Sequence, residues 1–179
     1  MIFRRVASAV LALLVNVPVT VAQDIVLPQR RSPIPQTTNG VPHVQLGIKP
    51  DPVLSELLLE SIATFPGVTL GPTRVSLPGA VGFQIDQDVT LAHPEVVVGG
   101  REFAHLHPDG SLHASLNPEL AEAAIRAGWA VSHPWANQRE GWEGFVMIFT
   151  PTSSGELDVV TMLVEQSYSF VTGRELHKE

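Results

Sequence analysis

Apolar residues recur at helical spacing in three segments of the chain, 53–64, 117–128 and 153–172. Each segment opens with side chains that favour a helix N-terminus: Asp51 before Pro52, Asn117 before Pro118, and Ser153 with Glu156 as a capping box. Gly128 and Gly173 stand where the second and third segments should stop. The pattern therefore predicts three helices, the last of which is the longest.

Short runs of β-forming residues alternate with proline and glycine between the helical segments. They cover 73–77, 82–85, 96–98, 101–107, 111–116, 129–133 and 145–150. The last run is apolar on both faces, which predicts a central strand. Short strands joined by tight turns predict an α+β fold, with an antiparallel or mixed β-sheet and about three helices packed on it.

The same pattern divides the chain into three parts. Residues 1–22 are predicted to be a secretory signal peptide, because two arginines precede an apolar run and small residues end it at Ala22. The alternative is an uncleaved membrane anchor, but Asn16 and Pro18 interrupt a run that is shorter than the roughly 20 apolar residues of a membrane span. Residues 23–50 are predicted to be a proline-rich arm or linker, and residues 51–175 one domain. We therefore expect an exported protein, periplasmic or secreted, with no membrane contact after cleavage.

Composition narrows the classes of function. Hydrophobic residues make up 44% of the chain and charged residues 16%, which is enough apolar material for a core. The net charge of -7 and the lack of a basic block argue against nucleic acid as a partner, because such affinity comes mostly from neutralising phosphates. Without cysteine, the chain has no disulfide, thiolate metal site or thiol nucleophile. We expect a small-molecule substrate instead.

Three histidines flank a predicted hairpin turn. Pro108-Asp109-Gly110 suits a three-residue loop, with proline at the second turn position and glycine in the left-handed position. In that register His105 faces His113 directly, and His107 lies on the same face because side chains alternate along a strand. The three imidazoles then converge on one side of the sheet. A two-residue loop would instead turn His113 to the other side.

Further candidates surround this cluster. Arg101 and Phe103 would share the histidine face, whereas Glu102 would not. Trp129 is predicted to form part of the core or of a pocket wall, and with Arg101 and Phe103 it makes up the candidate substrate-binding set. The candidate catalytic set contains the hairpin histidines, His133 before Pro134, and a carboxylate in the apolar last helix: His105, His107, His113, His133 and Glu165.

Clustered imidazoles permit several kinds of chemistry. An H-x-H pair with further ligands holds Fe, Mn, Cu or Zn on β-scaffolds, so His105, His107 and His113 are also a candidate metal site. A neighbouring imidazole can instead act as a general base near neutral pH. An H-x-H pair can also simply face solvent. A luciferase-like enzyme, a metal-dependent or metal-binding protein and a non-catalytic exported binding module therefore remain as alternatives.

Four motifs occur in a fixed order along the chain: REFAHLH at 101–107, SLH at 111–113, GW followed by HP within 128–134, and MLVE at 162–165. Together they resemble the luciferase domain of fungal luciferases and their bacterial relatives. The likeness runs over about residues 73–172. Any one of the motifs alone would carry little information, whereas the ordered set is specific.

The resemblance implies a possible oxidoreductase that uses O2. Fungal luciferases oxidise a hydroxylated α-pyrone through a peroxide that loses CO2, with no flavin or nucleotide, so O2 is the implied co-substrate. By analogy, His105, His107, His113 and His133 would line the pocket, where one of them would deprotonate an enol or stabilise a peroxide anion. The hairpin loop is shorter than the fungal one and an export signal is predicted. We therefore expect a small enolic or phenolic substrate outside the cytoplasm rather than light emission.

Overall fold

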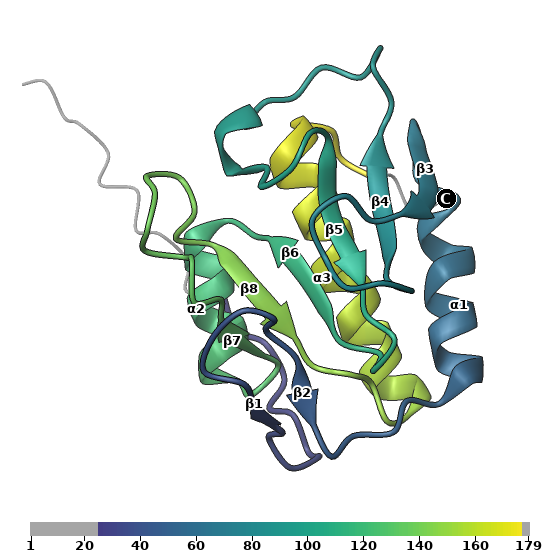
Figure 1. Ribbon diagram of the computed structural model, residues 1–179, viewed down its shortest axis with the longest axis vertical. Coiled ribbons are helices and arrows are strands. Elements are labelled where there is room, and N and C mark those ends of the chain that lie inside the picture. Colours follow the sequence, from purple (N-terminus) through teal and green to yellow (C-terminus); the bar gives the residue numbers. More distant parts are fainter. Residues whose placement is uncertain (1–24, 177–179) are drawn as a thin grey trace, which may run out of the picture.

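A computed structural model describes residues 25–176, and the predicted signal peptide at 1–22 lies outside them (Figure 1). The helices are α1 (Pro52–Ile62), α2 (Pro118–Arg126) and α3 (Ser154–Thr172), with a short 3-10 helix η1 (Pro94–Val96). The strands are β1 (Gln36–Thr37), β2 (Gln45–Leu46), β3 (Val68–Pro72), β4 (Val81–Ile85), β5 (Glu102–Leu106), β6 (Leu112–Ser115), β7 (Ala130–Ser132) and β8 (Phe145–Ile148).

The main sheet is antiparallel throughout and has the strand order β3-β4-β5-β6-β8-β7. Residues of α1, α2 and α3 pack in one core with the apolar side of this sheet, and Leu58, Leu163 and Val146 are fully buried there. The opposite side of the sheet carries the histidines. The predicted α+β class is confirmed, and burial of one continuous apolar face explains it.

The helices begin where the sequence predicts. Asp51 accepts a hydrogen bond from the Val53 amide at 2.9 Å and Asn117 accepts one from the Glu119 amide, so each satisfies an amide that the first helical turn leaves free. Ser153 caps α3 in the same way, and Gly173 ends it with a left-handed φ of 70°. These local signals needed no tertiary context.

Two predicted strands are wrong. Residues 73–77 form a loop, and the strand lies just before them as β3. The Thr73 hydroxyl and the Arg74 amide hydrogen-bond to the side chain of Glu102, which draws this segment away from strand pairing. Within residues 96–98, Val96 is the last residue of the 3-10 helix η1 and Val97 caps it; the helix starts at Pro94, where the ring fixes φ in the helical range. Both segments form walls of the site described below.

Residues 25–50, predicted to be an arm or linker, pack along the domain and carry the small sheet of β1 and β2. The Arg30 side chain is 2% exposed, pairs with Glu156 at 3.2 Å and donates to the Thr150 carbonyl. The indole of Trp129 donates to the Pro28 carbonyl at 2.6 Å. In Figure 1 this segment crosses in front of β7 and β8, whereas α3 lies behind the sheet. The arm therefore covers the histidine side.

No helix within residues 25–176 combines the length and the apolar character that crossing a bilayer requires.

Two glycines provide a matched test of the packing. A Cβ at Gly144 would lie 1.8 Å from the Leu116 carbonyl oxygen, whereas a Cβ at Gly155 would meet nothing within 4 Å. We expect Gly144→Ala to lower the free energy of unfolding by about 1–3 kcal/mol, because the backbone of the β6 end must shift. Gly155→Ala should leave it unchanged or raise it by up to about 1 kcal/mol, since alanine favours a helix. Urea unfolding curves compare the two, and equal losses would contradict this packing.

Candidate functional site

The hairpin of β5 and β6 brings three histidines together in the predicted register. His105 lies opposite His113, and the His107 amide bonds to the Ser111 carbonyl at 2.8 Å. Gly110 takes the left-handed conformation, with φ of 82°, that the three-residue loop requires. His105, His107 and His113 are 4%, 3% and 5% exposed, so they do not face solvent.

Two more histidines join the cluster from distant segments. His133 follows β7, and its ring meets the His113 ring edge-on with centroids 4.5 Å apart. His43, on the arm between β1 and β2, stacks on His113 with ring centroids 5.4 Å apart and also meets the edge of His133 at 5.1 Å. His43 was not predicted to belong to the site, because an irregular proline-rich segment has no periodicity that would show which way its side chains point.

A β-bulge on β5 overturns one prediction about the histidine face. Ala104 pairs with Phe83 and Glu102 pairs with Gln84, so Phe103 is an extra residue on this strand. Its ring packs on Phe83 and on Tyr168 of α3, on the core side of the sheet. Glu102 consequently turns to the histidine side, where the simple alternation of side chains had placed Phe103.

Glu102 is fully buried behind His105. It accepts hydrogen bonds from His105 Nδ1 at 2.9 Å, from the Thr73 hydroxyl at 2.6 Å, from the Arg74 amide and from the Gln84 amide group. Burial alone would raise the pKa of Glu102, but the donors, His105 foremost, hold it below its ordinary value. An ionised carboxylate therefore lies at the back of the cluster.

The partners of each ring fix the positions of its proton. The Glu102 carboxylate only accepts, so His105 carries its proton on Nδ1 and a lone pair on Nε2. The Ser111 hydroxyl donates to Asp109 at 2.7 Å and must therefore accept from His107 Nδ1 at 3.0 Å. His107 Nε2 thus also carries a lone pair, and this buried atom has no hydrogen-bond partner among the described residues.

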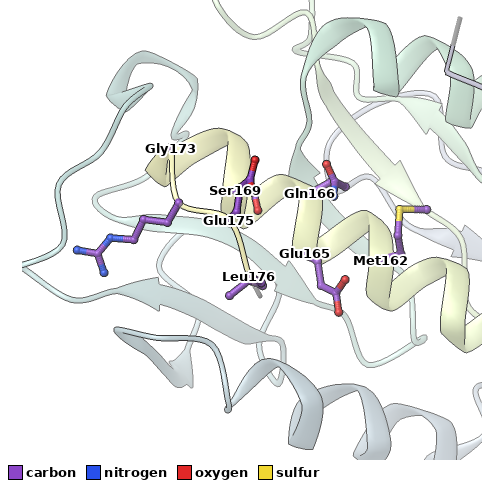
Figure 2. Close-up of a pocket in the computed structure, with 8 residues that line it drawn as sticks. Met162, Glu165, Gln166, Ser169, Gly173, Glu175 and Leu176 are labelled. Carbon is purple, nitrogen blue, oxygen red and sulfur yellow. The ribbon is translucent and has the colours of Figure 1, made fainter. Parts of the chain in front are cut away.

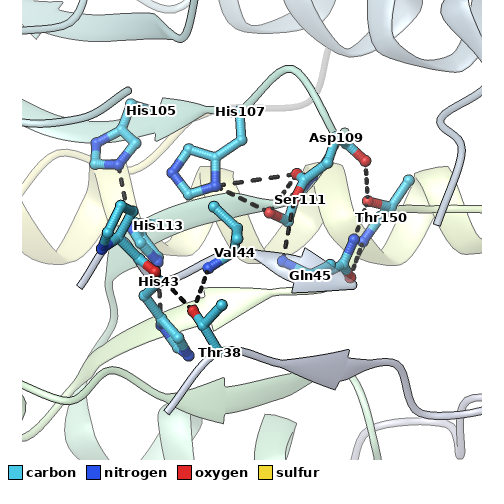
Figure 3. A network of polar contacts seen from close by, with 11 residues as sticks. Thr38, His43, Val44, Gln45, His105, His107, Asp109, Ser111, His113 and Thr150 are labelled. Atoms are coloured by element: carbon cyan, nitrogen blue, oxygen red, sulfur yellow. Dashed lines mark hydrogen bonds and ion pairs between the residues drawn. The ribbon is translucent and has the colours of Figure 1, made fainter. Parts of the chain in front are cut away.

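His113 and His43 continue this network (Figure 3). His113 Nδ1 lies 3.1 Å from His105 Nε2, and His113 Nε2 lies 3.3 Å from His43 Nδ1. His133 differs, because its Nδ1 accepts from the Trp135 amide at 3.1 Å. Neutral His133 consequently carries its proton on Nε2 and offers an N–H there.

Four of the histidines, His43, His107, His113 and His133, are held neutral. Burial lowers the pKa of His107 to about 4 and that of His133 to about 3, and neighbouring rings add to both shifts. Burial, followed by repulsion from the other rings, lowers the pKa of His113 still further, and burial lowers that of His43. A neutral imidazole can offer a lone pair as a base or a metal ligand at neutral pH.

The cluster lines a cavity of about 240 Å³. Five imidazoles line it, together with apolar and small side chains from the arm, from the 73–77 loop and from the segment around Trp135. The lining residues are Val41, Pro42, His43, Val75, Ser76, Leu77, Val98, His105, His107, His113, His133, Trp135 and Phe145.

The other predicted site residues lie elsewhere. Arg101 bonds to the Ile85 and Val89 carbonyls, and Phe103 and Trp129 are core residues, so none of the candidate substrate-binding set lines this cavity. Glu165 lies on α3 beside Met162 and Leu176, in a separate surface pocket (Figure 2). The site therefore keeps the four predicted histidines, adds His43 and Glu102, and does not include Glu165.

Two trios of these histidines have the spacing to hold a metal ion. One ring nitrogen from each of His105, His107 and His113 lies within 4.8 Å of the other two, and the same is true of His43, His113 and His133. His113 belongs to both trios. A single ion at either position would use the central ring of the network.

The sequence around the site is similar to proteins of known family. Residues 100–167 match the luciferase domain. The chain is 27% identical to the luciferases of Armillaria gallica and Armillaria ostoyae over 168 residues, and 28% identical to that of Armillaria mellea over 167 residues. These alignments cover 82% of this chain and 61% of each fungal protein, so the chain spans about six-tenths of their length. No solved structure matches. The resemblance identified from the histidine motifs is confirmed.

The lowered histidine pKa values make stability depend on pH. The unfolded chain binds protons to His107 and His133 near pH 6.5, whereas the folded chain binds them only near pH 4 and pH 3, respectively. The free energy of unfolding should therefore be highest above pH 6.5 and fall as the pH drops toward 4, by about 1.4 kcal/mol per pH unit for each extra proton bound by the unfolded chain.

Denaturant unfolding in EDTA between pH 7.5 and 4 measures this slope. His107→Asn keeps a donor to Ser111 but removes one titrating ring, so its slope should be shallower than that of the wild type. A flat wild-type profile would contradict the buried neutral cluster.

Proposed function

We propose that this chain is a luciferase-like enzyme that oxidises a small enolic or phenolic compound with O2 in the histidine cavity. The match of residues 100–167 to the luciferase domain supports the reaction class. The cavity supports the location, because it is bounded both by apolar side chains and by a few converging polar atoms.

A single observation carries the proposal: some imidazoles around the cavity present a lone pair, and another presents an N–H. His105 Nε2 and His107 Nε2 carry lone pairs, whereas His133 Nε2 carries a proton. A lone pair can take the proton of an enol, and an N–H can stabilise the negative charge that results. Since the rings are buried, these interactions act with little competition from water.

The proposed reaction begins with removal of the enol proton. The electron pair of the enolate carbon then forms a C–O bond with O2, which oxidises the carbon and reduces the oxygen to the peroxide level. Negative charge moves to the outer peroxide oxygen, where the N–H of His133 would stabilise it. Glu102 stabilises positive charge on His105 through the 2.9 Å bond to its Nδ1.

The cavity walls indicate the size of the substrate. Val75, Leu77 and Val98 line the space together with the aromatic residues Trp135 and Phe145, which suits a flat ring. Its volume of about 240 Å³ lies below the range of about 300–1,000 Å³ typical of sites for drug-sized ligands. We therefore propose a single-ring substrate, such as a hydroxylated pyrone or a catechol.

We further propose that the reaction takes place outside the cytoplasm, in the periplasm or after secretion. The charged and apolar pattern of residues 1–22 supports export. The net charge of -7 supports a small molecule rather than nucleic acid as the partner.

His133→Asn tests the proposed role of the N–H. The asparagine carbonyl can still accept from the Trp135 amide, but the Nε2 proton is lost. We expect O2 uptake with a panel of 4-hydroxy-2-pyrones and catechols, measured with an oxygen electrode, and a kcat lower by about 10²–10³-fold in the variant.

His93→Asn serves as the control, because His93 lies on the surface outside the cavity and should leave kcat unchanged. Unaltered kcat in His133→Asn would remove His133 from the mechanism. No substrate-dependent uptake by the folded wild type would refute the oxygenase proposal.

A further inference from the structure

We propose that His105, His107 and His113 bind one divalent first-row transition metal ion at the floor of the cavity. The inference deepens the proposed function by naming a cofactor class for the same site, and it rests on that function for what the ion would do. A bound ion would use the Nε2 lone pairs of His105 and His107, so it would replace them as the base and would stabilise the enolate as a Lewis acid. Binding itself is a property of the folded chain and can be measured without turnover.

Distances between the ring nitrogens suit a single ion. His105 Nε2 lies 3.1 Å from His113 Nδ1, and one nitrogen of each of the three rings lies within 4.8 Å of the others. Imidazole nitrogens bound at about 2.0–2.1 Å in tetrahedral geometry lie about 3.4 Å apart. Small rotations of the side chains about their own bonds would therefore bring all three nitrogens to one ion.

The unpartnered nitrogen of His107 points to a missing ligand. Nε2 is buried and has no hydrogen-bond partner among the described residues, while Nδ1 is bonded to Ser111. Leaving a buried polar atom unpaired is costly, so native structures satisfy nearly all of them. The lone pair of His107 needs a donor or a cation, and the described residues supply neither.

The groups behind the rings are those that orient histidine ligands. His105 Nδ1 donates to the Glu102 carboxylate, and His107 Nδ1 donates to Ser111, which in turn donates to Asp109. Such carboxylate contacts direct the Nε2 lone pair toward a metal and raise its basicity. Two carboxylates behind the rings also offset the charge of a divalent ion in a buried site.

Hydrogen bonds favour this trio over the alternative one. In the trio of His43, His113 and His133, the Nδ1 lone pair of His133 is already used by the Trp135 amide. Its Nε2 carries a proton and cannot act as a ligand in the neutral ring. His113 carries its proton on Nδ1, which faces the lone pair of His105 Nε2. It can bind an ion through Nδ1 in the other neutral form of the ring, with the proton on Nε2, and Nε2 can then donate a hydrogen bond to His43 Nδ1 at 3.3 Å.

The ligand set indicates which ions fit. Three neutral imidazoles without a thiolate suit Fe²⁺, Co²⁺, Cu²⁺ or Zn²⁺, and they disfavour Mg²⁺ and Ca²⁺, which prefer oxygen ligands. Three protein ligands leave at least one position open on an ion of this kind. Because the rings line the cavity, that position would face the substrate space.

Co²⁺ titration tests the proposal, because its visible absorption reports the coordination number. The protein is purified without a histidine tag or metal-affinity resin, stripped with chelator and titrated with Co²⁺, and bound metal is counted by elemental analysis after gel filtration. We expect one Co²⁺ per chain, intense bands typical of four- or five-coordinate cobalt, and a higher melting temperature on adding Zn²⁺.

Two asparagine variants make the matched comparison. His107→Asn keeps a donor to Ser111 and removes the Nε2 ligand, so the affinity for Co²⁺ should fall at least 100-fold. His133→Asn should bind like the wild type. If His107→Asn does not fold, nitrogen NMR of the wild-type rings replaces it. Zn²⁺ must then shift the ring-nitrogen signals of His105, His107 and His113, while His133 stays neutral with its proton on Nε2.

Absence of binding by the folded wild type would overturn the metal inference, as would equal affinity in His107→Asn or loss of binding only in His133→Asn. Oxygen uptake separates this outcome from the fate of the proposed function. Uptake by the chelated, metal-free protein would refute the ion's role and leave the oxygenase standing. One bound ion without uptake on any substrate would support the metal site and refute the oxygenase.

Discussion

The histidine cavity depends on the buried carboxylate of Glu102. An ionised carboxylate without partners would cost several kcal/mol in such a place, and here four donors surround it: His105 Nδ1, the Thr73 hydroxyl, the Arg74 amide and the Gln84 side chain. Space for it exists because residue 82 is glycine, where a Cβ would lie 2.7 Å from Glu102 Oε2. One carboxylate thus joins β4, β5 and the 73–77 loop, and it sets the proton position on His105, whose Nε2 meets His113.

Local signals in the sequence were sufficient to predict the helices and the convergence of the three hairpin histidines. Asp51, Asn117 and Ser153 each cap a helix through contacts within a few residues. Pro108-Asp109-Gly110 fixes the hairpin loop, and the loop fixes the register that places His105 opposite His113. These features were predictable because the turn and the caps depend on residues that are neighbours in the chain. The convergence of three imidazoles could therefore be predicted from the sequence alone.

Features that depend on distant contacts were not predictable in the same way. The bulge at Phe103 arises because that ring packs on Tyr168 in the core, and it exchanges the faces of Phe103 and Glu102 against simple alternation. The 73–77 run has β-type composition, yet the buried carboxylate holds it as a loop. His43 reaches the cluster from an arm anchored by the contact of Arg30 with Glu156, more than a hundred residues away in sequence.

The cavity is assembled from several segments of the chain. Four of the imidazoles and the Phe145 wall come from residues 100–167, the segment that matches the luciferase domain, whereas Val41, Val75, Leu77 and Val98 come from segments before it. Most of the imidazoles thus come from one segment, whereas the apolar walls come from several. The side chains of Val75, Leu77 and Val98 line the cavity without forming the hydrogen bonds that hold the rings, so substitutions there can change which molecules fit while every imidazole stays in place.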